Sequence, residues 1–258
     1  MYEKIDIDKL IEIAKKAGEA IMEVYGTEFS VENKDDKSPL TLADKRSNNI
    51  IIEHLVDLYP EIPLISEETK QTGFEERNHW KNCWLIDPLD GTKEFIKRNG
   101  EFTVNIALIE NGSPTIGVVF VPVQNTTYVG KKDIGSFKIE SDGEKHPISV
   151  KTGKDMDSIT IVGSRSHPSE ELELFIEEIK SRYDNVEFIA SGSSIKICLV
   201  AEGMADIYPR LGPTMEWDTA AGHAVVENAG GTLTDHKTGD TLKYNKENLL
   251  NPWFIVSN

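Results

Sequence analysis

Apolar residues recur at intervals of three and four in the first part of the chain, and this spacing predicts helices. One amphipathic helix is expected from about Asp8 to Gly26. Its apolar face is formed by Leu10, Ile11, Ala14, Ala17, Ile21 and Val24. A second helical pattern stops before Pro60 and carries Asp44 near its start. The polar residues 29–39 between the two patterns predict a loop.

The pattern then changes to short apolar segments separated by turns, which is typical of strands. The segment 62–65 leads into Ser66-Glu67-Glu68, and the segment 83–86 leads into Asp87, so two acidic motifs end two predicted strands. From residue 102 onward, strands separated by Asn-Gly and Asp-Gly turns predict a largely antiparallel sheet. These strands are expected at residues 102–109, 116–121, 127–129, 137–139 and 148–150.

Beyond residue 155 the predicted elements alternate between strand and helix, which favours a layered α/β arrangement. Strands are expected at residues 159–162, 186–189 and 205–208, and helices at 169–182, 194–201 and 219–228. We therefore predict a mixed α/β (α+β) protein with two domains. Residues 1–153 would hold the antiparallel sheet, and residues 154–258 would form an α/β domain.

The composition narrows the classes of function. The chain of 258 residues has 28 basic and 44 acidic residues and a net charge of −16, which disfavours sequence-independent binding to nucleic acid. Only two cysteines and an N-terminus without a signal pattern predict a reduced, cytoplasmic protein. No apolar run reaches the roughly 18 residues of a membrane span, so any membrane association would be peripheral. The sequence does not indicate the oligomeric state.

One turn concentrates candidate chemistry, in the sequence Trp84-Leu-Ile-Asp-Pro-Leu-Asp-Gly-Thr92. Asp87 and Asp90 lie three residues apart, and Pro88 restricts the backbone between them. Gly91 allows an anion to approach peptide N–H groups, and Thr92 adds a hydroxyl. Because carboxylates and substrate phosphates together are typical ligands of Mg²⁺, the turn predicts metal-assisted phosphate chemistry.

A second acidic motif, Glu216-Trp-Asp-Thr-Ala-Ala-Gly222, places Asp218 at the start of a predicted helix. Taken alone, this position is typical of a helix cap. A metal ligand is the alternative, and the other motifs favour it. Glu67, Asp87, Asp90 and Asp218 each fall where an element begins or ends, and sites are often built at such positions.

These motifs resemble the signatures of the lithium-sensitive, Mg²⁺-dependent phosphatases that include inositol monophosphatase and fructose-1,6-bisphosphatase. The corresponding segments are residues 84–92 and 217–222, with Glu67-Glu68 upstream. The resemblance extends over nearly the whole chain and is strongest to CysQ-type 3′(2′),5′-bisphosphate nucleotidases, which share residues 93–104 and Gly192-Ser-Ser-Ile-Lys196. It implies a five-layer α-β-α-β-α sandwich.

The resemblance also implies two Mg²⁺ sites that share one carboxylate. Glu67, Asp87 and the backbone carbonyl of Leu89 would hold one ion. Asp87, Asp90 and Asp218 would hold the other. Two metals about 3.5–4 Å apart can stabilise both the attacking and the leaving oxygen of an in-line displacement at phosphorus.

Water is the expected nucleophile, because neither a catalytic Cys nor a Ser-His pairing stands out in the sequence. The resemblance implies that Asp44 and Thr92 orient and deprotonate this water. It also implies that Glu68 assists through a third, weaker metal. Without the resemblance, Asp44 is interpreted as an acidic residue that favours the start of a helix.

Specificity is expected in the C-terminal half, because the metals would serve any phosphate monoester. The resemblance implies a group of residues that surround the nucleoside and its second phosphate. These residues are Ser164, His167, Gly192, Ser193, Lys196 and Arg210. The reacting phosphate would meet Glu67, Leu89, Asp90, Gly91, Thr92 and Asp218. The Gly-Ser-Ser sequence is also typical of a helix N-cap, and this interpretation is compatible with an anion site there.

These features lead to one hypothesis and two alternatives. The chain is expected to hydrolyse the 3′-phosphate of 3′-phosphoadenosine 5′-phosphate, with Mg²⁺ and an activated water, in the clearance of a by-product of sulfate activation. An inositol-monophosphate or fructose-bisphosphate phosphatase with the same metal core is the nearest alternative. A sensor that binds a phosphorylated metabolite without hydrolysing it is the alternative from another class.

Overall fold

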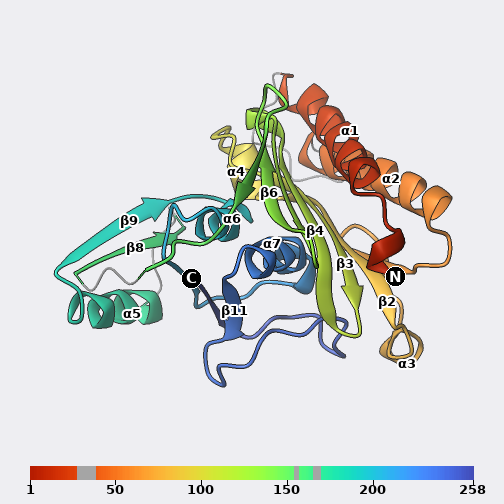
Figure 1. Ribbon diagram of the computed structural model, residues 1–258. Helices are drawn as coiled ribbons and strands as arrows, with labels where there is room; N and C mark the ends of the chain where they lie inside the picture. The colour runs from red at the N-terminus through yellow and green to blue at the C-terminus, as the bar shows by residue number, and fades with distance from the viewer. Residues whose placement is uncertain (28–38, 154–156, 165–169) are drawn as a thin grey trace.

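The computed structural model describes residues 1–258 apart from 28–38, 154–156 and 165–169. In the described part, two outer helices, a seven-stranded sheet, two central helices, a five-stranded sheet and one further helix follow one another as layers (Figure 1). The expected α-β-α-β-α sandwich is thereby confirmed. The loop predicted at residues 29–39 lies almost wholly outside the described residues.

The first layer consists of α1 (Ile7–Tyr25) and α2 (Pro39–Leu58), which pack against one face of the larger sheet. The helix α1 begins earlier than predicted. Its cap is Asp6, whose carboxylate accepts hydrogen bonds from the N–H groups of Asp8 and Lys9 at 3.0 and 3.3 Å. The apolar spacing therefore identified the buried face correctly but did not locate the first residue, since Asp6 and Asp8 are both acceptable caps.

The larger sheet runs in sequence order, with β1 and β2 parallel and each later neighbouring pair antiparallel. Its strands are β1 (Leu64–Ser66), β2 (Asn82–Asp90), β3 (Thr103–Glu110), β4 (Ser113–Val121), β5 (Thr126–Lys131), β6 (Gly135–Ile139) and β7 (Lys145–Ile148). The strand β7 begins before the predicted range 148–150 and overlaps it only at Ile148. Short helical segments not separately predicted are η1 (Tyr2–Lys4), α3 (Phe74–Arg77) and η2 (Pro122–Gln124).

The central layer holds α6 (Ile195–Ala201) and α7 (Glu216–Asn228), which lie on the opposite face of the larger sheet from α1 and α2 (Figure 1). The helix α7 approaches the backbone of β4 and β5 very closely. A Cβ added at Gly117 would lie 2.1 Å from the Ala221 carbonyl oxygen, and one at Gly130 would lie 2.3 Å from that of Ala224. The depth at which α7 sits on the sheet therefore depends on these two glycines.

The smaller sheet has the order β11-β12-β10-β8-β9. Its strands are β8 (Ser158–Gly163), β9 (Asn185–Ala190), β10 (Ile207–Arg210), β11 (Thr232–Asp235) and β12 (Phe254–Ser257), and α5 (Glu170–Lys180) packs on its outer face. The strands β11 and β12 were not predicted. The change from one sheet to the other occurs between Ile148 and Ser158, but buried residues of both sheets share one core, so two separate domains remain a prediction.

Candidate active site

A β-bulge brings the two aspartates of the first motif to one side of the sheet. Asp87 pairs with Asn105 and Asp90 with Thr103, so β2 has one residue more than β3 over this interval. Residues three apart in a regular strand face opposite sides, and the extra residue cancels that difference. The bulge leaves no backbone donor unpaired, because Pro88 has no N–H and the Leu89 N–H donates to Asp87 Oδ1 at 3.0 Å.

Three carboxylates meet beside this bulge, and they come from the turn after β1, from β2 and from α7. Oxygens of Glu67, Asp87 and Asp218 all lie within 4.8 Å of one another, and Asp87 is only 1% exposed. Burial raises the pKa of each of them, and negative charges of the neighbouring carboxylates add to the effect. The pKa of Asp218 is raised to about 7. The repulsion that raises these pKa values would be relieved by a bound cation.

Asp90 lies next to these three carboxylates, and its charge raises the pKa of each. One of its oxygens, Oδ2, already accepts hydrogen bonds from the N–H of Ser194 at 2.6 Å and its Oγ at 2.9 Å. Asp218 also has a structural role at the start of α7, where its Oδ2 accepts the N–H of Met215 at 2.9 Å. The capping and metal interpretations of Asp218 are therefore compatible, although it occupies the third helical position rather than the cap.

The helix α2 brings Asp44 to the same cluster. Asp44 is 8% exposed, and burial, followed by the negative charges of Glu68 and Glu67, raises its pKa to about 8. Two serines hold this region together. Ser47 Oγ donates to the Pro88 carbonyl at 2.7 Å, and Ser66 Oγ donates to Asn48 Oδ1 at 2.6 Å.

Gly91 and Thr92 lie where β2 passes into the short helix α4 (Thr92–Ile96). Gly91 has a left-handed backbone with φ +94°, and an added Cβ would lie 3.0 Å from the Glu101 carbonyl oxygen and 3.2 Å from Ser193 Cβ. Only glycine therefore fits both the conformation and the space. Thr92 is exposed at the first position of α4, and its proposed role toward water stays a prediction.

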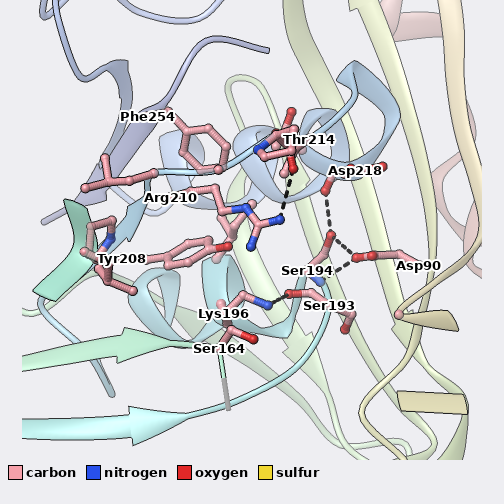
Figure 2. A pocket seen from close by; sticks show the side chains of 18 of the residues that line it. Asp90, Ser164, Ser193, Ser194, Lys196, Tyr208, Arg210, Thr214, Asp218 and Phe254 are labelled. Carbon is pink, nitrogen blue, oxygen red and sulfur yellow. Dashed lines mark hydrogen bonds between the residues drawn. The ribbon is translucent and has the colours of Figure 1, made fainter. Parts of the chain in front are cut away.

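A pocket of about 420 Å³ opens beside the carboxylates, which is a size typical of small-molecule sites. Its lining comes from β2, α4, α6, β10, α7, β12 and the segments beside them, and it includes Asp90, Gly91, Lys93, Ser164, Ser193, Ser194, Lys196, Tyr208, Arg210, Thr214, Asp218 and Phe254 (Figure 2). The structure thus brings metal-ligand candidates from the first half and specificity candidates from the second half into one cavity.

Two cations in the pocket reach toward the wall that carries Asp90 and Asp218 (Figure 2). The Lys196 ammonium donates to the Ser193 carbonyl at 2.7 Å, and Arg210 donates to the Pro213 carbonyl at 3.0 Å. Lys196 is 6% exposed, and burial lowers its pKa to about 8 despite the favourable charge of Asp90. An anionic ligand would stabilise the charged form of this buried lysine.

The other predicted specificity residues are placed differently. Gly192 packs behind the lining, where an added Cβ would lie 2.6 Å from Glu94 Cγ and 2.7 Å from the Glu101 carbonyl oxygen. His167 lies outside the described residues. Ser194 was not predicted as a site residue. It occupies the cap position of α6, as the Gly-Ser-Ser sequence predicts, but its side chain makes no capping hydrogen bond.

Conspicuous residues outside the pocket have structural roles. Trp84 and Trp217 are buried in the two main cores, as expected. Cys83 and Cys198 are buried free thiols whose pKa values are raised by burial, so both are poor nucleophiles. Among the described residues, no helix combines the length and apolar character needed to cross a membrane.

Comparisons with known proteins agree with this geometry. A family model described as the inositol monophosphatase family matches residues 4–256. The 3′(2′),5′-bisphosphate nucleotidase CysQ of Escherichia coli is 46% identical over 254 residues, which cover 97% of this chain and 99% of that protein. CysQ of Bacteroides thetaiotaomicron has a structure with a TM-score of 0.90 at 43% identity, covering 98% of both chains. An inositol monophosphatase of Anabaena has a TM-score of 0.76 at 25% identity, covering 98% of this chain and 90% of that one.

Proposed function

This chain belongs to the inositol monophosphatase family, and we propose that it is an Mg²⁺-dependent 3′(2′),5′-bisphosphate nucleotidase. Its substrate would be 3′-phosphoadenosine 5′-phosphate, and its products AMP and phosphate. The observation that carries this proposal is a carboxylate cluster beside a pocket, to whose lining Asp90 and Asp218 belong, together with two cations inside that pocket, Lys196 and Arg210. The carboxylate cluster would act on the phosphate that is cleaved, and the two cations would bind the phosphate that is retained.

The donor set fits divalent cations. Carboxylate oxygens are the preferred ligands of Mg²⁺, and the pKa values of Glu67, Asp87 and Asp218 are raised by mutual repulsion as well as by burial. We propose two Mg²⁺ ions held by these residues together with Asp90 and the Leu89 carbonyl, and a third near Glu68. Bound Mg²⁺ would supply charge neutralisation at the phosphate and activation of the attacking water.

The chain's own groups would orient the reactants around that centre. Asp44 is the proposed proton acceptor, because its burial and its neighbouring carboxylates raise its pKa to about 8, close to the operating range of a general base. Bound cations would lower that pKa. Thr92 would help to hold the attacking water, and the N–H groups of Gly91 and Thr92 would bind phosphate oxygens.

The retained phosphate would occupy the cationic part of the pocket. Lys196 is held by Ser193, and Arg210 lies on β10 with its Nε buried and without a hydrogen-bond partner among the described residues. We propose that both contact this phosphate and that Ser164 and Ser193 contact the nucleotide nearby. The reduced, cytoplasmic setting expected from the sequence belongs to the same proposal.

A turnover panel tests the proposed substrate. Phosphate release is measured with 3′-phosphoadenosine 5′-phosphate, its 2′ isomer, inositol 1-phosphate and fructose 1,6-bisphosphate, each with and without Mg²⁺. We expect Mg²⁺-dependent release with the highest kcat/KM for the nucleotides. A large preference for inositol or fructose phosphates would replace the nucleotidase assignment, and nucleotide binding without any hydrolysis would support the sensor alternative.

Variants of the ligand residues test the two-metal arrangement. Asp87→Asn, Asp90→Asn and Asp218→Asn should each abolish phosphate release, since each removes a charge that the cations require. Activity retained in Asp90→Asn and Asp218→Asn, but lost in Asp87→Asn, would require a different metal site.

A further inference from the structure

Ser194 makes an unusual set of hydrogen bonds at the junction of three elements. A serine at a helix cap normally accepts a hydrogen bond from its own helix, but this side chain does not. Its Oγ instead lies 2.9 Å from Asp90 Oδ2 and 2.7 Å from the Asp218 carbonyl oxygen (Figure 2). The residue is only 2% exposed, so water does not compete freely for these partners.

A third partner fixes the direction of the hydroxyl proton. Asn105 Nδ2 donates to Ser194 Oγ at 2.9 Å, and Asn105 lies opposite Asp87 in the β2–β3 pairing. Because Asn105 fills an acceptor position, the single proton of the hydroxyl points to the side of Asp90 and Asp218. The backbone N–H of Ser194 also donates to Asp90 Oδ2, at 2.6 Å. This N–H engages Asp90 Oδ2 directly, so Oδ1 is the Asp90 oxygen that Ser194 leaves free to face a cation.

The same turn carries the cationic part of the pocket. Ser193 has a left-handed backbone with φ +43°, and its carbonyl accepts the Lys196 ammonium at 2.7 Å. A movement of Asp90 would be transmitted through Ser194 to the backbone that holds Lys196. Among the described residues of this turn, only the Ser194 side chain hydrogen-bonds to proposed metal ligands, whereas the hydrogen bonds of the Ser193 and Lys196 side chains stay within the turn.

We propose that Ser194 is a positioning residue that presents Asp90 to the cation and couples the cation site to the phosphate pocket. The proposed role of Ser194 toward the cation rests on the acidic cluster alone. The coupling part rests on the proposed function, because it assumes that the pocket binds a phosphate. Partners that orient metal ligands typically change metal affinity by about 10–100-fold when they are removed.

The first experiment measures Mg²⁺ binding to the full, metal-free chain by calorimetry, without substrate. Ser194→Ala keeps the backbone N–H but removes the hydroxyl, and we expect it to weaken Mg²⁺ binding by roughly tenfold. Ser194→Thr keeps the hydroxyl and should restore the affinity. Ser136→Ala is the matched control, because Ser136 is a buried serine whose Oγ donates to the Val225 carbonyl at 2.7 Å away from the pocket.

The outcome is decided by comparing these variants. Unchanged Mg²⁺ affinity in Ser194→Ala would overturn the proposal, and so would an equal loss in Ser136→Ala, which would indicate general destabilisation. If Ser194→Ala does not fold, Asn105→Ala provides the second variant, since it removes the donor that directs the hydroxyl, and it should weaken Mg²⁺ binding in the same direction. An affinity equal to that of the wild type in this variant would likewise overturn the proposal.

The second experiment tests the coupling with AMP as the probe. Its Kd is measured with and without Mg²⁺, and the ratio should be closer to one in Ser194→Ala than in the wild type. An unchanged ratio would overturn the coupling. If AMP does not bind the wild-type protein at all, the proposed function fails, while the Mg²⁺ calorimetry still tests the positioning role by itself.

Discussion

Replacing Lys196 by methionine should make the metal-free protein more stable at pH 7 while weakening its hold on the substrate. The lysine is 6% exposed, and burial lowers its pKa from 10.5 to about 8. Since one pKa unit corresponds to about 1.36 kcal/mol, keeping this group charged costs roughly 3 kcal/mol. Methionine has a similar length but loses the hydrogen bond to the Ser193 carbonyl, worth about 1 kcal/mol. The expected net gain is about 2 kcal/mol.

The stability difference between the wild type and Lys196→Met should depend on pH, because the folded and unfolded proteins bind the Lys196 proton over different pH ranges. Below pH 8 Lys196 is protonated in both the folded and the unfolded protein, so the full penalty is present. Between about pH 8 and 10.5 the folded protein loses the proton while the unfolded chain keeps it, and wild-type stability therefore rises relative to the variant. Urea unfolding in EDTA should show the advantage of Lys196→Met at pH 7 and its disappearance near pH 10.5. A gain that does not change with pH, or a loss at pH 7, would refute the reasoning.

The same variant should raise the KM for the bisphosphate by at least about tenfold, because removing one member of a buried charge pair typically costs about 2–5 kcal/mol. Lys131→Met is the matched control. Lys131 is 8% exposed and donates to the Ile5 carbonyl at 2.9 Å, outside the pocket, so its loss should leave the KM unchanged. An equal rise of KM in both variants would show that the effect is not local to Lys196.

Three further outcomes are expected. Gly91→Ala should lower the free energy of unfolding by at least about 1 kcal/mol more than Gly143→Ala, because both have positive φ but only Gly91 has atoms close to an added Cβ; equal losses in urea unfolding would contradict the packing argument. Mg²⁺ affinity measured by calorimetry should rise from pH 6 to 8, since the pKa of the proposed ligand Asp218 is raised to about 7 and a ligand must lose its proton to bind; a flat profile would count against it. Millimolar lithium should inhibit phosphate release and added Mg²⁺ should restore it, as expected for competition at a cation site, and unchanged activity would argue against such a site.

Local patterns were sufficient to predict most of the fold. The three-and-four spacing identified α1 and α2, and the Asn-Gly turn marked the hairpin between β3 and β4, because both signals depend on neighbouring residues. The strands β11 and β12 were missed. They pair with each other and, through β12, with β10, so their status as strands depends on partners that are distant in sequence.

The site was predictable to a similar extent. The acidic motifs identified Glu67, Asp87 and Asp218, and the structure brings these residues together. Ser194 could not be found in this way, because a serine before a helix is ordinarily a cap, and its bonds to Asp90 and Asp218 come from the meeting of β2, α6 and α7. The absence of a capping bond becomes visible only in three dimensions.

The bulge in β2 limits how the aspartate motif can be transferred to another protein. Grafting residues 87–92 onto a regular hairpin would turn the two aspartates to opposite faces, and only one would reach a shared cation. A working graft would also need the shorter partner interval from Asn105 to Thr103 and a donor for the Pro88 carbonyl, which Ser47 provides here. For a designer, the smallest transferable unit is therefore a pair of strands with the helix that supports them.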